Sequence, residues 1–298
     1  MQDRFYTNFK GKNSDKTAQK DRYGNVQGNE FDLAKDNAFI GKTIAVLHLY
    51  TGDGFDFYLP EGALKEKGFH IVRWQDCLPT INEFKKVLSQ SSQLWLISTH
   101  TKLLNEEYLT VIKEFFNSGR GLFLWGDNEP FFQDSNFVSK ALLGTTMSGS
   151  VQGEKTISLQ NGNTKFGIVP NHAITTGLEF LYEGHTIATI TETGDLNPLI
   201  YGSAGNLVAA YYEKDERRAV VDGGFTRLYM KWDTAGTARF VKNAAAWLTN
   251  VERFDLSSNK PGESKAVENI MSRWDKRSNS SQKETNSLPN IDSIFSKF

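Results

Sequence analysis

Asp127, Asn128 and Glu129 directly follow an apolar run that ends in a glycine turn, and they are the first candidates for chemistry. In open α/β sheets, ligands and catalytic groups gather at the carboxyl ends of the parallel strands. Asp127 and Glu129 could act there as an acid–base pair, or could bind a hard cation together with Asp53. The alternative is a tight turn, because Asp and Asn bond their own backbone readily. The turn in segment 119–130 has no Cys, Ser or His. The sequence therefore indicates where a functional site lies more clearly than which reaction the site catalyses.

Histidine supplies a second set of candidates. His100 follows another apolar run and is well placed for general acid–base work, since histidine gains and loses a proton near neutral pH. The alternative is a loop histidine with no catalytic role. His48 lies inside an apolar run and is interpreted as a core residue, and His172 as a residue that fixes a turn. Because these three lack H-x-x-x-H spacing, we expect no metal site.

The loop 51–56 contains two glycines and two acids, Asp53 and Asp56. It is neither a Walker A sequence nor a G-x-G-x-x-G motif, and its acids would repel phosphate. Dinucleotide binding is therefore disfavoured, and we expect no cofactor.

A late apolar run ends at Asp222, and Arg227 and Lys231 follow it. The two cations could clamp an anionic ligand; the alternative is a surface ion pair that contributes little. Phe225, Tyr229 and Trp232 add aromatic surface of the kind used to bind sugars or partners. The residues expected to bind a ligand are Asp53, Asp56, Asn128, Asp222 and Arg227.

Alternating elements must position these candidates. Near-continuous apolar runs are typical of parallel strands buried on both faces, and they occur at 43–49, 69–74, 94–98 and 122–125. Amphipathic stretches separate them: Thr80 and Glu83 form a capping box, and Asn105 can cap the next helix. This order predicts an α/β fold with a flavodoxin-like open, mostly parallel sheet and helices on both faces.

The second half has a different pattern. Residues 145–215 contain short β-like runs at 155–159, 166–169, 185–190 and 207–212, which predict a β-rich insertion. A returning core strand at 218–222 and a final helix over about 234–248 complete the domain.

Three segments carry a family resemblance: Gly119 to Asn128, the sequence N-H-A-I-T-T-G-L at 171–178, and V-V-D-G-G at 220–224 followed by a helix ending in A-A-W-L. Over roughly 40–250 the chain resembles the class I glutamine amidotransferase-like superfamily. It is most similar to a divergent branch that includes trehalose-utilisation-type proteins and the amino-terminal domain of an intraflagellar transport subunit. The resemblance implies the same α/β fold, with the first segment at the position of the nucleophile elbow.

The chain departs from that family where the family does its chemistry. Amidotransferases carry a cysteine at the elbow, where this chain has Gly126 and Asp127. The only cysteine, Cys77, follows the second predicted strand, and Asp222 with two glycines replaces the family's His–Glu pair. If the elbow were catalytic, Asp127 would be its nucleophile.

The domain organisation follows from these patterns. We expect a flexible N-terminal arm over 1–37, the amidotransferase-like α/β domain over 38–252, and a largely disordered tail over 253–298 with short amphipathic motifs. One such motif, with helical spacing, consists of Ile291, Ile294, Phe295 and Phe298. It could dock back onto the domain or bind in a partner's groove.

Composition limits the partners. The formal net charge is -1 with no sustained basic block, which argues against nucleic acid or a membrane surface as the main partner. The single cysteine and the absence of a secretory signal or apolar span indicate a cytoplasmic protein. The first functional hypothesis is a non-catalytic binding or scaffolding module that recruits a protein partner through its tail. The alternative is a hydrolase or small-ligand (sugar or metabolite) processing enzyme that uses Asp127, Glu129 and His100.

Overall fold

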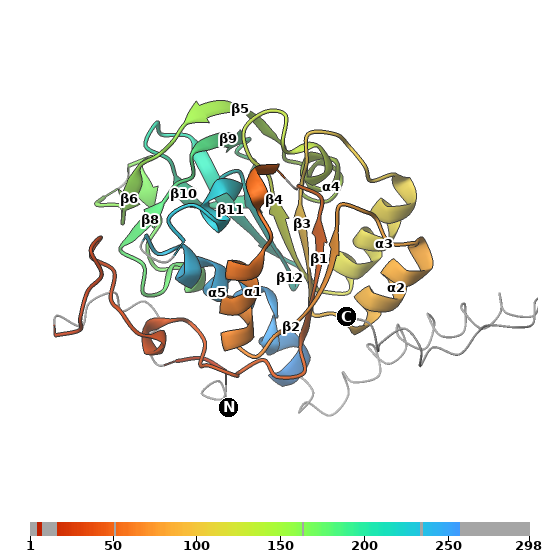
Figure 1. Cartoon of the computed structure of the whole chain (residues 1–298), viewed down its shortest axis with the longest axis horizontal. Coiled ribbons are helices and arrows are strands. Elements are labelled where there is room, and N and C mark those ends of the chain that lie inside the picture. Colours follow the sequence, from red (N-terminus) through yellow and green to blue (C-terminus); the bar gives the residue numbers. More distant parts are fainter. Residues whose placement is uncertain (1–4, 8–16, 51, 163, 233–234, 257–298) are drawn as a thin grey trace, which may run out of the picture. The chain divides into compact units, whose positions relative to one another are not determined.

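The computed structural model describes residues 5–7, 17–50, 52–162, 164–232 and 235–256 (Figure 1). The chain divides into two compact units, Met1–Arg253 and Phe254–Phe298. The tail motif of Ile291, Ile294, Phe295 and Phe298 lies outside the described residues, so its docking stays a prediction. In the described ranges, no helix combines the length and the hydropathy needed to cross a bilayer.

A large sheet organises the first unit. Its strands lie in the order β2 (His70–Gln75), β1 (Thr43–His48), β3 (Gln93–Ile97), β4 (Gly121–Trp125), β12 (Arg217–Asp222), β11 (Leu207–Lys214), β10 (Leu196–Tyr201) and β7 (Gly167–Ile168). From β2 to β12 neighbouring strands pair in parallel, and the last three pair antiparallel. The parallel part has the 2-1-3-4-5 order of flavodoxin-like folds, which confirms the predicted fold class.

Helices cover both faces of this sheet (Figure 1). They are α1 (Tyr58–Glu66), α2 (Ile81–Gln90), α3 (Glu106–Asn117), α4 (Gln133–Leu143) and α5 (Thr237–Leu248). The predicted caps are present: Thr80 Oγ1 accepts a hydrogen bond from Glu83 N, and Asn105 Oδ1 accepts one from Glu107 N. The sequence pattern did not predict α4, because Asp134, Ser135 and Ser139 occupy buried positions in it.

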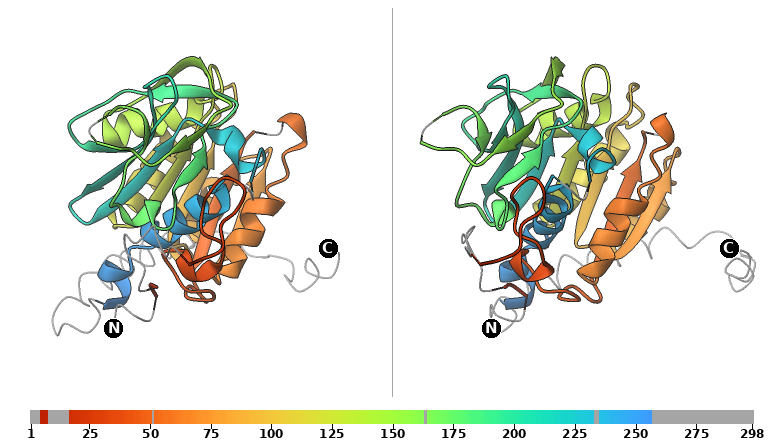
Figure 2. Two further views of the ribbon diagram at one scale, coloured as in Figure 1. Left: turned by 90° about the vertical axis from the view of Figure 1, so that its left-hand side faces the viewer. Right: turned by 60° about the vertical axis from the view of Figure 1, so that its left-hand side comes forward.

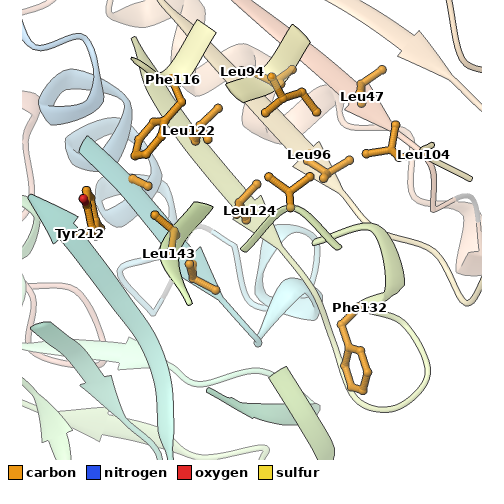
Figure 3. Packing of buried hydrophobic residues seen from close by; sticks show 14 of the residues in the cluster. Leu47, Leu94, Leu96, Leu104, Phe116, Leu122, Leu124, Phe132, Leu143 and Tyr212 are labelled. Carbon is orange, nitrogen blue, oxygen red and sulfur yellow. The ribbon is translucent and has the colours of Figure 1, made fainter. Parts of the chain in front are cut away.

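The core lies between the sheet and its helices. Leucines of β1, β3 and β4 point to one face, where they pack against α2, α3 and α4 (Figure 3). The other face carries larger rings: Trp95, Phe123 and Trp125 contact one another, and Phe123 also meets Phe240 of α5. All of these rings are fully buried. This packing explains why the strands read as continuous apolar runs.

The β-rich insertion predicted for the second half is present as two small antiparallel sheets. One pairs β5 (Met147–Gln152) with β9 (Thr186–Ile190), and the other pairs β6 (Thr156–Ser158) with β8 (Phe180–Tyr182). The predicted runs at 155–159 and 185–190 correspond to β6 and β9. β5 reads M-S-G-S-V-Q and lacks an apolar run, because only one of its faces is buried.

The described part of the N-terminal segment differs from a flexible arm. Residues 17–37 run alongside α5 (Figure 2), and Phe31 and Leu33 are buried. Leu33 N donates to Asn243 Oδ1 at 2.7 Å, and Arg239 donates to the carbonyl oxygens of Val26 and Gly28. Composition could not indicate this docking, because the polar side chains that make the segment look disordered pair with partners distant in sequence.

Candidate functional site

A cleft of about 790 Å³ opens over the carboxyl ends of the parallel strands. Its lining comes from the loops after β1, β3, β4 and β12 and from the start of β9. The lining residues are Tyr50, Gly52, Thr99, His100, Asp127, Asn128, Phe131, His185, Thr186, Thr226, Tyr229 and Met230. The location agrees with the strand-end rule for open α/β sheets.

The end of β4 places Asp127 in the cleft. Gly126 N donates to Asp222 O at 2.8 Å, and Phe225 N donates to Gly126 O at 3.1 Å, so the turn is fixed against the end of β12. A Cβ added to Gly126 would lie 2.8 Å from the Met147 sulfur and 2.9 Å from the Phe132 Cβ, so a larger residue would require these neighbours to shift. Asp127 N then donates to Phe131 O at 3.1 Å, and the residue is 6% exposed.

The loop after β3 brings His100 to the same cleft. The His100 ring meets the Phe131 ring edge-on at 6.1 Å, and Thr99 Oγ1 lies 3.3 Å from His100 Nδ1. The first turn of α4 fixes both ends of this loop. Ser135 N donates to Ser98 Oγ at 2.7 Å, and Asp134 Oδ1 accepts from the amides of Leu103 and Leu104. Burial raises the Asp134 pKa, and these two hydrogen bonds oppose that shift.

The insertion forms the remaining wall. Thr186 Oγ1 donates to Asn128 Oδ1 at 2.7 Å and joins the start of β9 to the end of β4. His185 Nδ1 lies 2.7 Å from Glu154 Oε1, and His185 N donates to Thr226 Oγ1 at 2.7 Å. His185 therefore contacts Glu154 through its ring and Thr226 through its backbone amide at the cleft.

The cleft brings together part of the predicted site. Asp127, Asn128 and His100 line it. Glu129 does not; it is exposed, and its amide donates to Gly149 O at 3.0 Å. The predicted grouping of Asp127, Glu129 and His100 therefore reduces to Asp127 and His100 in this structure.

Asp222 and Arg227 form a fully buried ion pair below the cleft lining rather than a surface clamp. Arg227 Nη1 lies 3.0 Å from Asp222 Oδ2, and both side chains are 0% exposed. Arg227 also donates to Glu183 O, and Asp222 Oδ1 accepts from Gly224 N. Burial raises the Asp222 pKa to about 6, although the Arg227 charge opposes the shift. Neither side chain reaches a ligand in the cleft directly.

Asp56 of the 51–56 loop is not among the lining residues. Asp53 falls in the short 3-10 helix Gly52–Gly54. Asp56 is exposed and accepts a hydrogen bond from Tyr58 N at 3.1 Å, where α1 begins. Asp56 therefore stabilises the start of α1.

His48 and His172 are structural, as the sequence indicated. His48 is fully buried, with Nδ1 2.8 Å from an Arg73 nitrogen, and burial lowers its pKa to about 4. His172 Nδ1 accepts from Ile174 N, its ring stacks on Tyr211 at 4.0 Å, and burial lowers its pKa to about 4. No set of three or more His, Cys, Asp or Glu side chains within the described ranges is arranged to hold a metal ion.

The sequence did not identify the contribution of the insertion. His185, Thr186 and Thr226 belong to no local motif, because their neighbours in the cleft are far away in the chain. Tyr229 was included only as general aromatic surface near Arg227. The Glu183-Gly184 pair directly before His185 is the one local feature of the sequence that indicates a loop ending at His185.

Comparisons with known proteins reach only distant similarities. No family model matches the sequence, and no curated protein matches it. Among solved structures, a protein described as ThuA-like from Parabacteroides merdae is 10% identical, with 70% of this chain and 90% of that chain covered and a TM-score of 0.47. ThuA-like proteins are therefore among the structural neighbours at low identity.

Two carbohydrate-active enzymes are also among these neighbours. An exo-β-1,4-mannosidase from Opitutaceae bacterium strain TAV5 is 12% identical, with 70% of this chain and 36% of that chain covered and a TM-score of 0.41. The carbohydrate deacetylase Agd3 is 14% identical, with 70% and 32% covered and a TM-score of 0.39. This chain thus spans about a third of each enzyme, and the named activities are those of the whole enzymes.

Proposed function

We propose that the cleft binds a neutral, hydroxyl-bearing small molecule of the sugar class and hydrolyses it with Asp127 and His100 as acid–base groups. One observation carries the proposal: a carboxylate and an imidazole from adjacent strand ends line one cleft that has no lysine or arginine among its described lining residues. The cleft volume of about 790 Å³ falls within the roughly 300–1,000 Å³ of small-molecule sites.

The lining favours a neutral ligand over an anionic one. Phosphate and carboxylate groups are usually recognised by arginine, lysine or a helix N-terminus. The hydroxyls of Thr99, Thr186 and Thr226 and the Asn128 amide offer both donors and acceptors to ligand hydroxyl groups. The rings of Tyr50 and Phe131 meet edge-on at 5.6 Å and supply apolar surface for the carbon–hydrogen face of a sugar ring.

The reaction class follows from the two ionisable groups. In hydrolysis, one group withdraws a proton from water while a second gives a proton to the departing oxygen. Such proton transfer by positioned side chains accelerates reactions by about 10²–10⁴-fold. Asp127 is 6% exposed and therefore has fixed surroundings, whereas His100 is exposed and contacts the Phe131 ring edge-on, which leaves it accessible to a ligand in the cleft.

A second candidate is a binding module without catalysis. It is supported by Gly126 and Asp127, which occupy the position that the resemblance assigns to the catalytic cysteine, and by Cys77, which is exposed and does not line the cleft. In that case the cleft would bind its ligand without turnover. Partner recruitment through Ile291, Ile294, Phe295 and Phe298 belongs to this candidate and remains a proposal.

Ligand titration distinguishes the candidates. Neutral mono- and disaccharides are titrated calorimetrically beside their phosphorylated forms, and 4-nitrophenyl glycosides report turnover. We expect the neutral forms to bind more tightly, and His100→Asn to lower turnover at least about 100-fold. The matched control is His70→Asn, at an exposed residue at the start of β2. Preference for the phosphorylated forms contradicts the proposed ligand class, and binding without turnover supports the second candidate.

A further inference from the structure

Glu154 and His185 form a carboxylate–imidazole couple at the cleft. His185 lines the cleft, and its Nδ1 lies 2.7 Å from Glu154 Oε1. Glu154 follows β5 and His185 precedes β9, so the couple joins the two strands of one small sheet. Neither residue belongs to the group predicted from the strand ends.

The backbone fixes the two residues against each other. Gly153 N donates to His185 O at 2.8 Å, and Glu154 N donates to Gly184 O at 2.7 Å. A Cβ on Gly153 would collide with the Gly184 carbonyl oxygen, so the close approach of the segments requires glycine. Glu154 itself has a φ of 71°, which side-chain-bearing residues adopt only when their surroundings hold them there.

This rigidity separates the couple from an ordinary surface ion pair. Both side chains are about half exposed, at 44% for His185 and 52% for Glu154, so their attraction adds little to stability. Chains of hydrogen bonds nevertheless fix the backbone on both sides, including the bond from His185 N to Thr226 Oγ1. The arrangement holds a carboxylate oxygen 2.7 Å from the imidazole Nδ1, the ring nitrogen that faces the carboxylate in hydrolytic triads.

The couple and Asp127 belong to the same cleft. The hydrogen bond from Thr186 Oγ1 to Asn128 Oδ1 joins the residues that directly follow His185 and Asp127 in the chain. Both His185 and Asp127 line the cleft. The insertion therefore brings a second oriented proton acceptor to the strand-end site.

We infer that His185, oriented by Glu154, is the general base of the reaction. The inference rests on the proposed function and refines it: the base is His185, and Asp127 or His100 acts as the acid. The Glu154 carboxylate, 2.7 Å from Nδ1, favours the tautomer that carries the proton on Nδ1, which leaves the Nε2 lone pair as the proton acceptor. Nε2 takes a proton from water while the water oxygen bonds to the carbon under attack. The departing oxygen keeps the electron pair of the broken bond and takes a proton from Asp127 or His100. Solvent exchange then restores both groups, so the sum is addition of water without oxidation or reduction.

The test begins with the tautomer of His185, which needs no substrate. Proton–nitrogen correlation spectra resolve the two ring nitrogens, and the sequence has five histidines, so His185→Asn assigns the signal. We expect the Nδ1–H form in the wild-type protein and a shift toward Nε2–H in Glu154→Gln. The control Glu213→Gln removes a carboxylate that pairs with Arg218 instead. An unchanged tautomer in Glu154→Gln overturns the inference.

Turnover of a 4-nitrophenyl glycoside provides the second readout. His185→Asn should lower kcat at least about 100-fold and Glu154→Gln about tenfold, with saccharide affinity changed less than about threefold. Full turnover by His185→Asn overturns the inference and leaves the proposed function intact. The expected tautomer shift without binding of any neutral saccharide supports the couple and refutes the ligand class. Among the described residues, Glu154 is the one ion-pair partner of the His185 side chain, and the contact adds little to stability, so both variants should fold, as a thermal melt would verify.

Discussion

Two regions gather charged and polar side chains, and they do so in opposite ways. Around Asp32, three cations surround one buried carboxylate: Lys67 Nζ and Lys242 Nζ lie 2.9 and 2.8 Å from Oδ2, and Arg239 Nε lies 2.8 Å from Oδ1. At the cleft, Asp127 lies beside hydroxyls, imidazoles and aromatic rings, with no lysine or arginine in the described lining.

The difference separates structural chemistry from chemistry available to a ligand. The charges of the Asp32 cluster neutralise one another once Asp36 and Glu66 are included, and they connect the N-terminal segment to α1 and α5. We call the cluster closed because its charged groups pair with one another, although Asp32, Arg239 and Lys242 also border a smaller cleft of about 310 Å³. The cleft is open, because its polar groups border a volume large enough for a small molecule. The contrast predicts that substitutions in the cluster change stability, whereas substitutions in the cleft change binding and turnover.

The largest effect is expected in the closed region. Asp32→Asn leaves the fully buried Lys67 without its central counter-charge, although Asp36 still lies 2.6 Å away. Loss of one partner from a buried ion pair typically costs about 3–5 kcal/mol of unfolding free energy. Urea denaturation measures this cost, and the control Asp36→Asn, at a half-exposed carboxylate, should cost about 1 kcal/mol or less. Equal losses from the two variants would contradict the closed character of the cluster.

The pH dependence of the unfolding free energy provides a second test, at the fully buried His48. Burial lowers the His48 pKa to about 4, whereas an unfolded histidine titrates near about 6.5. A depressed folded-state pKa means that His48 favours folding above pH 6.5 and loses this contribution as the pH falls through 4. The loss approaches about 3 kcal/mol over that interval. Unfolding free energies of wild type and His48→Asn measured between pH 7 and pH 4 should converge, and a constant difference would refute the assignment.

The smallest effect is expected where the two walls of the cleft meet. Thr186→Val removes the hydrogen bond to Asn128 and keeps the side-chain volume. We expect saccharide affinity to fall a few-fold, in line with about 1 kcal/mol for a hydrogen bond, and stability to change by less than that. Thr110→Val on the exposed face of α3 is the control, since its hydroxyl bonds only a helix carbonyl. Equal affinity in both variants would show that the hydrogen bond between Thr186 and Asn128 does not shape the cleft.

Local patterns were sufficient to predict the parallel half of the molecule. Apolar runs and the caps at Thr80 and Asn105 depend on neighbours in the chain, so they are visible in the sequence. The strand-end rule then placed Asp127 and His100 at one rim. Glu129 did not join them, because its amide bonds Gly149 O of the insertion and its side chain is exposed, and no local sequence pattern indicates this contact.

Long-range packing explains what the sequence could not predict. Asp222 and Arg227 looked like surface residues beside a Gly-Gly turn, yet the antiparallel extension of the sheet and the insertion bury both. The segment 17–37 was predicted to belong to a flexible or loosely docked arm, although Asp32 has three partners between 35 and 210 residues further along the chain. His185 meets Glu154 only because two short strands pair.

The most direct test of the open cleft is a single variant measured twice. Asp127→Asn preserves the size of the side chain at the end of β4, and both its unfolding free energy in urea and its turnover of a 4-nitrophenyl glycoside are determined. We predict a change of less than about 1 kcal/mol in stability and a loss of at least about 100-fold in kcat. A loss of about 3 kcal/mol in stability with unchanged kcat would contradict the proposed role of Asp127, because Asp127 would then stabilise the fold, as Asp32 does, and would not take part in turnover.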